Sequence, residues 1–249
     1  MDGRKEQTRV MEAAVIIPTY NESDNIVTLV EEILGLRAVA HVIIVDDNSP
    51  DGTGHIAGEL AKQYREVHVI HRPGKLGLGT AYIAGFEFAL TLPTDCIVTM
   101  DADFSHHPRY IPSLIAPTRV YDLSIGSRYV DGGGTINCNL WRRFLSRAGN
   151  TVARLTLGLQ ASDCTAGFRC YRRQVLEAID LDSISSSGYS FLVEMLYKCQ
   201  QLGYRVGEVP IIFENRQQGA SKISRTEIWK AAHTVLRLGC ERIVGSPRP

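Results

Sequence analysis

The chain has 249 residues, of which 44% are apolar and 22% charged, a composition typical of one large globular domain. Lys plus Arg and Asp plus Glu number 27 each, so no net charge attracts nucleic acid. No apolar run approaches the ~18 residues of a membrane span, and the polar first residues are unlike a signal peptide. The six cysteines show neither C-x-x-C nor zinc-ligand spacing. We therefore expect a reduced, cytoplasmic protein and exclude collagen, coiled coils, disulfide scaffolds and integral membrane proteins.

The first half of the chain alternates short apolar runs with segments of helical spacing. We expect strands at 13–17, 41–45, 67–70 and 96–100, and helices at 24–34, 53–64 and 80–90. Strands that alternate with helices of this length predict βαβ units and a largely parallel sheet. In such α/β sheets, ligands bind beyond the carboxyl ends of the strands.

The second half is less regular. We expect a strand at 122–125, a flexible turn at 132–134, a basic helix at 140–157, and helices at 190–202 and 227–238 with a strand at 204–213 between them. No repeat, linker or low-complexity tract interrupts the chain, which predicts a single domain over 1–249. Residues 1–10 are expected to form a flexible arm. The segment 224–244 is either an amphipathic interfacial helix or an ordinary helix packed on the core, with Ile228, Trp229, Ala232, Val235 and Leu236 on one stripe.

Polar and largely acidic residues follow three of the expected strands. They are the segments 18–22, 46–49 and 101–103. Carboxylates gathered at one sheet edge are costly unless a cation or sugar hydroxyls meet them. Asp101 and Asp103 alternate along the chain, so one can bind a divalent ion and the other a sugar hydroxyl. For His106 and His107 we favour loop or capping roles over metal binding.

The charge is unevenly distributed. Residues 128–173 carry eight Arg against two acidic residues, a net charge of +6. An acidic rim and a basic patch indicate a metal-bound nucleotide that meets a second anion, although solvated helix faces are the alternative. Lys75 precedes the glycines of the segment 75–80, which therefore does not match a phosphate-binding P-loop. No nucleophile elbow, H-E-x-x-H motif or dinucleotide fingerprint is present.

Several ordered motifs together resemble the family-2 glycosyltransferases. They are Val15–Glu22, Val45–Gly52, Gly77–Tyr82, Met100–Pro108, Gly126–Tyr129, Arg142–Arg147, Asp163–Arg169, Gly207–Pro210 and Gly219–Lys222. Within that family the pattern is similar to the dolichol-phosphate (polyprenol-phosphate) mannosyltransferases, over about residues 13–240. The resemblance implies one α/β domain of the GT-A type, Rossmann-like, with a mainly parallel central sheet flanked by helices.

The resemblance also implies roles for individual residues. The residues that match the nucleotide-sugar site are Pro18, Tyr20, Glu22, Val45, Asp47, Asp101, Ala102, Asp103, Arg216 and Lys222. Asp103, assisted by Ser105, matches the site of Mg²⁺ or Mn²⁺, and the catalytic set is Asp101, Asp103 and Arg128. The lipid-phosphate set is Arg128, Arg142 and Ser146, of which the last two lie one helical turn apart.

The activity implied is inverting transfer of mannose from GDP-mannose to a polyprenyl or dolichyl phosphate, at the cytosolic face of a membrane. The chain would bind the membrane surface peripherally, or through a membrane-embedded anchoring subunit. One alternative is a sister lipid-phosphate glycosyltransferase that uses a UDP-sugar such as UDP-glucose. The other is a non-catalytic nucleotide-sugar-binding subunit, which we would expect to lack Asp101, Asp103 or Lys222; all three are present.

Overall fold

The computed structural model describes residues 11–214 and 225–244, apart from the side chains of residues 142, 189, 225–228, 243 and 244. Its main sheet has seven strands in the order β3-β2-β1-β4-β7-β5-β8. These strands are Ala13–Thr19 (β1), Val39–Asp46 (β2), Val67–His71 (β3), Cys96–Thr99 (β4), Leu123–Ser127 (β5), Arg169–Arg172 (β7) and Val206–Pro210 (β8). A second sheet pairs Gly134–Ile136 (β6) with Ile212–Glu214 (β9). The predicted arm, residues 1–10, lies outside the described residues.

The main sheet is parallel except at β7, which runs antiparallel to both β4 and β5. The predicted strand at 204–213 is wrong in one respect, because it is divided between the two sheets. Pro210 has no amide hydrogen for the ladder, so β8 ends there. The chain crosses at Ile211, whose amide donates to the Ser127 carbonyl at 3.1 Å and whose carbonyl accepts from the Gly134 amide at 2.9 Å.

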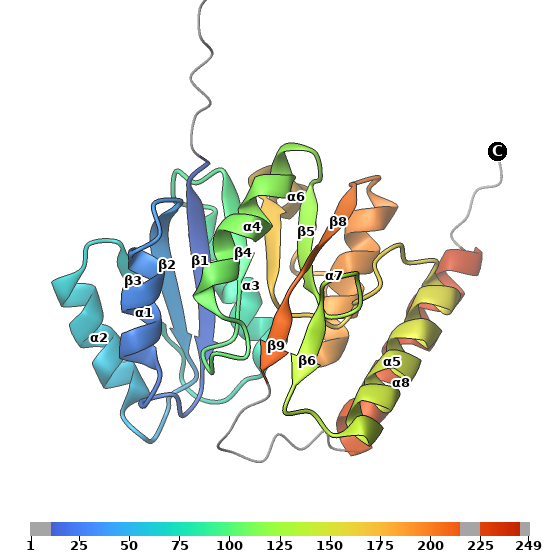
Figure 1. The fold of residues 1–249 in the computed structure, drawn as a ribbon, viewed down its shortest axis with the longest axis horizontal. Helices are drawn as coiled ribbons and strands as arrows, with labels where there is room; N and C mark the ends of the chain where they lie inside the picture. The colour runs from blue at the N-terminus through green and yellow to red at the C-terminus, as the bar shows by residue number, and fades with distance from the viewer. Residues whose placement is uncertain (1–10, 215–224, 245–249) are drawn as a thin grey trace, which may run out of the picture.

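Helices cover both faces of the main sheet (Figure 1). One face carries Ile26–Leu34 (α1), Thr53–Gln63 (α2) and the short helix Ile111–Ile115 (α4). The other carries Leu78–Ala89 (α3), Arg173–Ala178 (α6) and Tyr189–Gln201 (α7). Two long helices, Leu140–Leu157 (α5) and Arg225–Val244 (α8), lie side by side next to α7. The predicted α/β architecture is therefore confirmed, and the basic helix at 140–157 has the predicted bounds.

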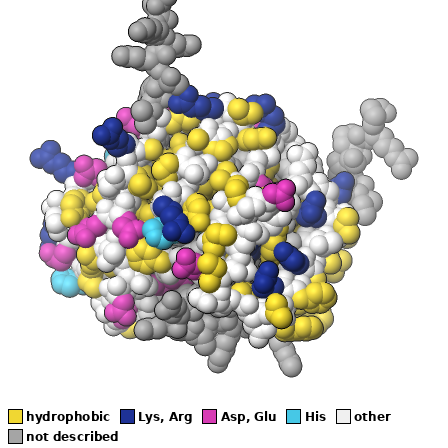
Figure 2. Space-filling model, in the orientation of Figure 1, with side chains coloured by type: hydrophobic (Ala, Val, Ile, Leu, Met, Phe, Trp, Pro, Cys, Tyr) yellow, Lys and Arg dark blue, Asp and Glu magenta, His cyan; other side chains and the backbone are white. Residues whose placement is uncertain are grey.

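The helices α5 and α8 each have a buried side and an exposed side. In α8, Val235 and Leu238 are buried, whereas Trp229 and Leu236 are exposed. The exposed apolar side chains of α5 are Leu140, Trp141, Phe144, Val152 and Leu155. Figure 2 shows hydrophobic side chains gathered at the lower right, below basic ones, where Figure 1 places the start of α5. The stripe predicted for the last helix is thus divided between a packed side and an exposed side. Within the described ranges, no helix has the length and apolar character needed to span a bilayer.

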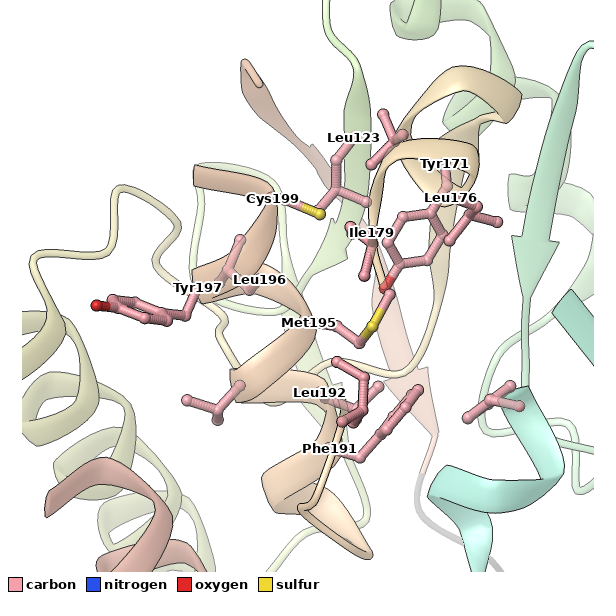
Figure 3. Packing of buried hydrophobic residues seen from close by; sticks show 14 of the residues in the cluster. Leu123, Tyr171, Leu176, Ile179, Phe191, Leu192, Met195, Leu196, Tyr197 and Cys199 are labelled. Carbon is pink, nitrogen blue, oxygen red and sulfur yellow. The ribbon is translucent and has the colours of Figure 1, made fainter. Parts of the chain in front are cut away.

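The helix α7 fills the space next to β5 and β7 with apolar side chains (Figure 3). Phe191, Met195 and Cys199 are buried together with Tyr171 of β7 and Leu123 of β5. Burial of side chains of this size stabilises a fold by about 1.5–3 kcal/mol each. Burial also raises the pKa of the Cys199 thiol to about 12, so this cysteine acts as an apolar core residue. All six cysteines are free thiols.

Candidate active site

The carboxyl ends of the parallel strands meet at one edge of the main sheet, together with the amino end of β7. Thr19 at the end of β1 is in register with Asp46 at the end of β2. At the end of β4, the Thr99 hydroxyl donates to the Gly167 carbonyl at 2.7 Å, next to β7. A Cβ atom at Gly167 would lie 3.8 Å from Oδ1 of Asp101. The topology therefore brings the predicted acidic residues to one rim.

The carboxylates of Asp46 and Asp47 have different partners although the two residues are adjacent. Asp46 accepts hydrogen bonds from the hydroxyls of Thr19, at 3.0 Å, and Ser49, at 2.6 Å, so it holds two loops together. Asp47 instead forms a buried ion pair with Arg72, with 2.7 Å between Oδ1 and Nη1. Burial raises the pKa of Asp47, and the Arg72 guanidinium opposes that rise. Asp46 therefore ties the strand ends together, whereas Asp47 is held at this edge by Arg72.

Arg72 was not predicted, yet it links Asp47 after β2 to the start of α3. Its Nη2 donates to the Thr80 hydroxyl at 2.6 Å, at the start of α3. Gly77 caps α3 with φ 102°, a conformation that favours glycine. The only sequence signal for Arg72 is its position directly after β3, at the ligand-binding edge of the sheet. The glycine segment 75–80 is thus a turn into a helix, as predicted, and it is tied to Asp47 through Arg72.

Hydrogen bonds to Asp51 join the loops that follow β1 and β2. Its carboxylate accepts the Thr53 amide at 3.0 Å, the Thr53 hydroxyl at 2.6 Å and the Ser23 amide at 3.0 Å. Desolvation opposes ionisation, but these hydrogen bonds prevail and lower the pKa of Asp51 to about 2. The Thr53 hydroxyl also accepts the Glu22 amide at 2.9 Å. The loop that carries Tyr20 and Glu22 is therefore fixed from the β2 side.

Five further predicted nucleotide-site residues lie at or below this edge. Tyr20 is exposed, and Lys75 Nζ lies 3.8 Å from its ring centroid. The buried Glu22 accepts the side-chain amide of Asn25 at 2.9 Å. Val45 and Ala102 are buried in the hydrophobic cores, so their side chains serve packing. Pro18 ends the buried run of β1 and is half-buried.

Asp101 and Asp103 follow β4 and are both half-buried. The Asp101 amide donates to Nδ1 of the buried His106 at 3.3 Å, and the same nitrogen lies 3.6 Å from Oδ2 of Asp101. Nδ1 of His107 accepts the Arg109 amide at 3.3 Å and caps the short helix Pro108–Tyr110. The loop and capping roles predicted for the two histidines are therefore confirmed.

The loop after β4 has chemistry that fits a divalent cation. Oδ1 of Asp103 accepts the Ser105 amide at 3.0 Å, and the intervening Phe104 has a left-handed backbone with φ 58°. Backbone conformations of this kind are costly for non-glycine residues and concentrate at functional sites. A half-buried carboxylate is a ligand that Mg²⁺ and Mn²⁺ accept, so Asp103 fits such an ion. Ser105 is buried and contacts Asp103 through its backbone. Within residues 11–214 and 225–244, no three His, Cys, Asp or Glu side chains form a ready-made metal cluster.

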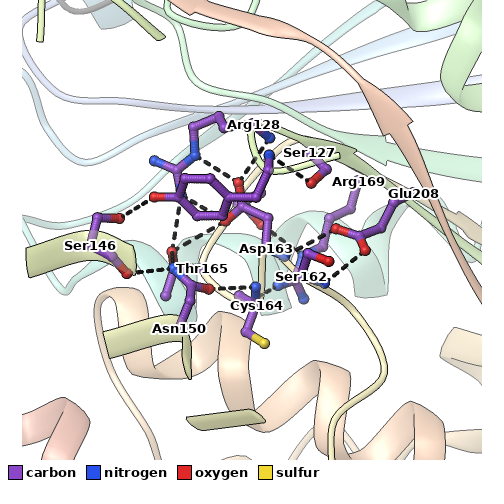
Figure 4. A network of polar contacts seen from close by, with 12 residues as sticks. Ser127, Arg128, Ser146, Asn150, Ser162, Asp163, Cys164, Thr165, Arg169 and Glu208 are labelled. Atoms are coloured by element: carbon purple, nitrogen blue, oxygen red, sulfur yellow. Dashed lines mark hydrogen bonds and ion pairs between the residues drawn. The ribbon is translucent and has the colours of Figure 1, made fainter. Parts of the chain in front are cut away.

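On the other side of the rim, Arg128 after β5 forms a two-pronged ion pair with Asp163 (Figure 4). Nε and Nη2 each lie 2.7 Å from a different carboxylate oxygen. Asp163 is fully buried, and its backbone amide donates to Glu208 at 3.0 Å. Arg128 also donates to the Thr165 hydroxyl at 3.1 Å. The guanidinium is therefore held rigidly by the segment that precedes β7.

The predicted lipid-phosphate residue Ser146 belongs to the same network. Its hydroxyl accepts from the Tyr129 hydroxyl at 2.8 Å, and its carbonyl accepts from Asn150 at 2.9 Å. Ser146 thereby joins Arg128 at one site, beside the acidic rim. The Arg142 side chain, Arg216 and Lys222 lie outside the described part of the chain.

Sequence reasoning assigned no role to Asp163, Glu208 or Arg169, although each lies in a motif that carried the resemblance. Arg169 is fully buried and donates to the carbonyls of Ala166, at 2.7 Å, and Cys164, at 2.7 Å. These residues shape the loop beneath Arg128. Motif membership was the available signal, but it did not separate supporting residues from ligand-binding ones.

A comparison with known protein families gives the class of the protein. The family described as glycosyl transferase family 2 matches residues 14–180. The chain therefore belongs to glycosyl transferase family 2, and the predicted membership is confirmed.

Curated relatives match most of the chain. One is the undecaprenyl-phosphate mannosyltransferase of Micrococcus luteus, 45% identical over 229 residues, which cover 92% of this chain and 94% of the relative. Another is the polyprenol monophosphomannose synthase of Mycolicibacterium smegmatis, 46% identical over 228 residues, which cover 90% and 86%.

Among solved structures, the chain is similar to glucosyl-3-phosphoglycerate synthase from Mycobacterium tuberculosis in complex with phosphoglyceric acid. The TM-score is 0.69 at 19% identity, over 92% of this chain and 80% of that one. The complex of the same enzyme with Mn²⁺, UDP and glucosyl-3-phosphoglycerate gives a TM-score of 0.66 at 20% identity, over 96% and 81%. At this identity the likeness shows the fold alone, and it confirms the GT-A-type architecture.

Proposed function

We propose that this protein is a metal-dependent enzyme that transfers mannose from GDP-mannose to a polyprenyl or dolichyl phosphate, with inversion at the anomeric carbon. The observation that carries the proposal is the 45% identity to an undecaprenyl-phosphate mannosyltransferase over 94% of that relative. An acidic rim beside a cluster of arginines also suits the reaction, which brings a cation-bound nucleotide diphosphate to an anionic acceptor.

The donor would bind along the acidic rim. Asp47 and Glu22 would accept hydrogen bonds from the base and the ribose, next to the Tyr20 ring. Asp101 would accept hydrogen bonds from sugar hydroxyls, and Asp103 would hold Mg²⁺ or Mn²⁺. When bound, such a cation stabilises the charge that develops on the leaving diphosphate.

Two further predicted donor residues are Arg216 and Lys222, which lie outside the described residues. As cations, they would add to the stabilisation of the leaving diphosphate. Their contribution remains a prediction from the resemblance.

The acceptor would attack from the side of Arg128, Arg142 and Ser146. A phosphate monoester has a second pKa near 6, so around neutral pH it is largely a dianion and already a nucleophile. No general base is then required. His106 is the histidine nearest to Asp101, but it is buried and its Nδ1 already accepts the Asp101 amide. Attack opposite the diphosphate would give a β-linked product.

The acceptor is a lipid, and we propose that the chain meets it by docking peripherally on the cytosolic face of a membrane. The surface involved would be the exposed apolar side of α5 and α8, which includes Trp141, Phe144 and Trp229. Arg143 and Arg147 lie on the same helix as Trp141 and Phe144, and basic side chains near apolar ones favour anionic lipid. A membrane-embedded anchoring subunit is the alternative occupant of this surface.

The test is transfer of labelled mannose from GDP-mannose to farnesyl phosphate, with Mg²⁺ or Mn²⁺ and then with EDTA. We expect product only with metal. Asp103→Asn should reduce the rate on the order of a hundredfold or more. Asp182→Asn, at an exposed carboxylate between α6 and α7, is the matched control and should leave the rate unchanged.

Three other outcomes would contradict parts of the proposal. Turnover with UDP-glucose and not with GDP-mannose would assign the chain to the sister enzymes. GDP-mannose binding without turnover on any acceptor would indicate a binding subunit. Full activity in EDTA would overturn the metal requirement.

A further inference from the structure

One tyrosine ring lies close to two guanidinium groups in the Arg128 network. The Tyr129 ring centroid is 5.1 Å from Cζ of Arg128 and 5.5 Å from Cζ of Arg147. Both distances are within the range in which the negative face of an aromatic ring attracts a cation. Tyr129 follows β5, whereas Arg147 lies on α5, so the ring joins two elements.

The same tyrosine also closes a ring of hydrogen bonds. Its hydroxyl donates to the Ser146 hydroxyl at 2.8 Å, and the Ser146 carbonyl accepts from Asn150 at 2.9 Å. Asn150 Nδ2 also donates to the Thr165 hydroxyl at 3.2 Å, which in turn accepts from Arg128, the neighbour of Tyr129, at 3.1 Å. Hydrogen bonds to the hydroxyl and to the backbone carbonyl of Ser146 thus fix the position of α5 relative to the sheet edge.

The two arginines differ in their charge balance. Arg128 is paired with the buried carboxylate of Asp163. Arg147 is exposed, and within residues 11–214 and 225–244 no carboxylate lies within salt-bridge distance of it. A cation held beside a ring without a carboxylate partner, one residue from the Ser146 hydroxyl, can bind an anion without first losing an ion pair.

We infer that Tyr129 and Arg147 complete the acceptor phosphate site, an inference that rests on the proposed function. Arg147 contacts the phosphate together with Ser146. Tyr129 is a positioning residue: its ring holds the Arg147 guanidinium, and its hydroxyl orients that of Ser146. The ligand class is a phosphate monoester carried on a lipid.

The experiment measures binding of farnesyl phosphate by calorimetry without donor or vesicles, and then the KM of each substrate. Arg147→Gln should raise the Kd and KM for farnesyl phosphate about tenfold and leave the KM for GDP-mannose within about twofold. Arg147→Lys should restore part of the loss. Tyr129→Phe, which keeps the ring and removes the hydroxyl, should raise the acceptor KM about threefold. Arg154→Gln, an exposed arginine further along α5, is the matched control for general charge effects.

A Kd for farnesyl phosphate that is the same in Arg147→Gln and Arg154→Gln would overturn the inference, as would a wild-type protein that does not bind farnesyl phosphate. Inorganic phosphate as a second probe separates recognition of the phosphate from that of the chain. If the wild type binds farnesyl phosphate, loses it in Arg147→Gln and yet does not use GDP-mannose, the phosphate site stands and the proposed donor fails. Circular dichroism excludes misfolding of each variant.

Discussion

At the scale of single residues, Asp51 shows how one carboxylate fixes the loops that follow β1 and β2. Its folded pKa of about 2 lies below that of an unfolded aspartate, so the unfolded chain binds the proton more tightly. The stabilisation is therefore complete above about pH 5 and is lost as the pH falls towards 2. Because Asp51 is exposed, solvent screening reduces its value at pH 7 to about 1 kcal/mol.

Asp51→Asn should therefore lower the free energy of unfolding by about 1 kcal/mol at pH 7 and by less at pH 3. Urea unfolding at both pH values measures the difference. Asp24→Asn, at an exposed carboxylate in the neighbouring loop, should change stability little at either pH. A loss of stability that does not depend on pH would mean that shape, and not ionisation, carries the effect.

Residue-scale prediction from the sequence located the acidic groups but not their partners. Asp101 and Asp103 could be placed at the rim from the sequence, because a strand end is recognisable as the end of an apolar run. The division of labour between Asp46 and Asp47 depends on Arg72, which is on another strand end and gives no local pattern. Likewise, the anchoring of Arg128 depends on Asp163, 35 residues away. Long-range pairs of this kind are set by the fold.

At the scale of elements, α3 packs closely against β1. A Cβ atom at Gly85 would lie 2.5 Å from Cγ2 of Ile16, which is fully buried and has no room to move. Gly85→Ala should therefore destabilise the protein by about 1–3 kcal/mol through overpacking. The control is Gly58→Ala in α2, where nothing lies within 4 Å of the added atom.

Gly58→Ala should stabilise the protein by about 0.5–1 kcal/mol, because alanine has the higher helix propensity. The two variants make the same chemical change and should shift the melting temperature in opposite directions. If both raise it, the close approach of α3 to β1 is not rigid.

Regular helices and buried strands were predicted well because their periodicity is strong. The short elements β7 and α6 were missed, since β7 has only four residues and includes Arg169 and Arg172. A buried arginine contradicts the apolar pattern of a central strand, and only the carbonyl groups around Arg169 explain it. Pro210 is a sequence signal for the end of β8, but the expected strand at 204–213 runs through it.

At the scale of the whole molecule, the zero net charge is the sum of an acidic part and a basic part. The acidic rim lies on β1, β2 and β4, whereas the basic network lies on β5 and α5. The apolar side of α5 and α8 adjoins the basic part. Phe144 of the apolar side and Ser146 of the Arg128 network lie on the same helix, α5. Under the proposed function, a lipid phosphate can therefore reach Arg128 and Ser146 while the hydrocarbon chain of the lipid stays in a bilayer next to α5.

This arrangement predicts that lipid binding and catalysis can be separated. Trp141 and Phe144 are exposed and stack on each other with ring centroids 5.8 Å apart. Replacing both with Gln removes roughly 3 kcal/mol or more of apolar transfer energy, about a hundredfold in vesicle partitioning. Sedimentation with vesicles of phosphatidylglycerol and phosphatidylcholine measures it. Val120→Gln, at an exposed apolar residue before β5, should not change partitioning.

The activity of the double variant then distinguishes a bilayer from a protein partner. If the apolar side of α5 lies in lipid, transfer to a long polyprenyl phosphate in vesicles should fall far more than transfer to farnesyl phosphate in solution. Vesicles that lack phosphatidylglycerol should bind even the wild type more weakly, because the arginines of α5 lose their anionic partners. Unchanged partitioning of the double variant would leave this face to a membrane-embedded subunit, since neighbouring exposed apolar side chains mark an interaction surface.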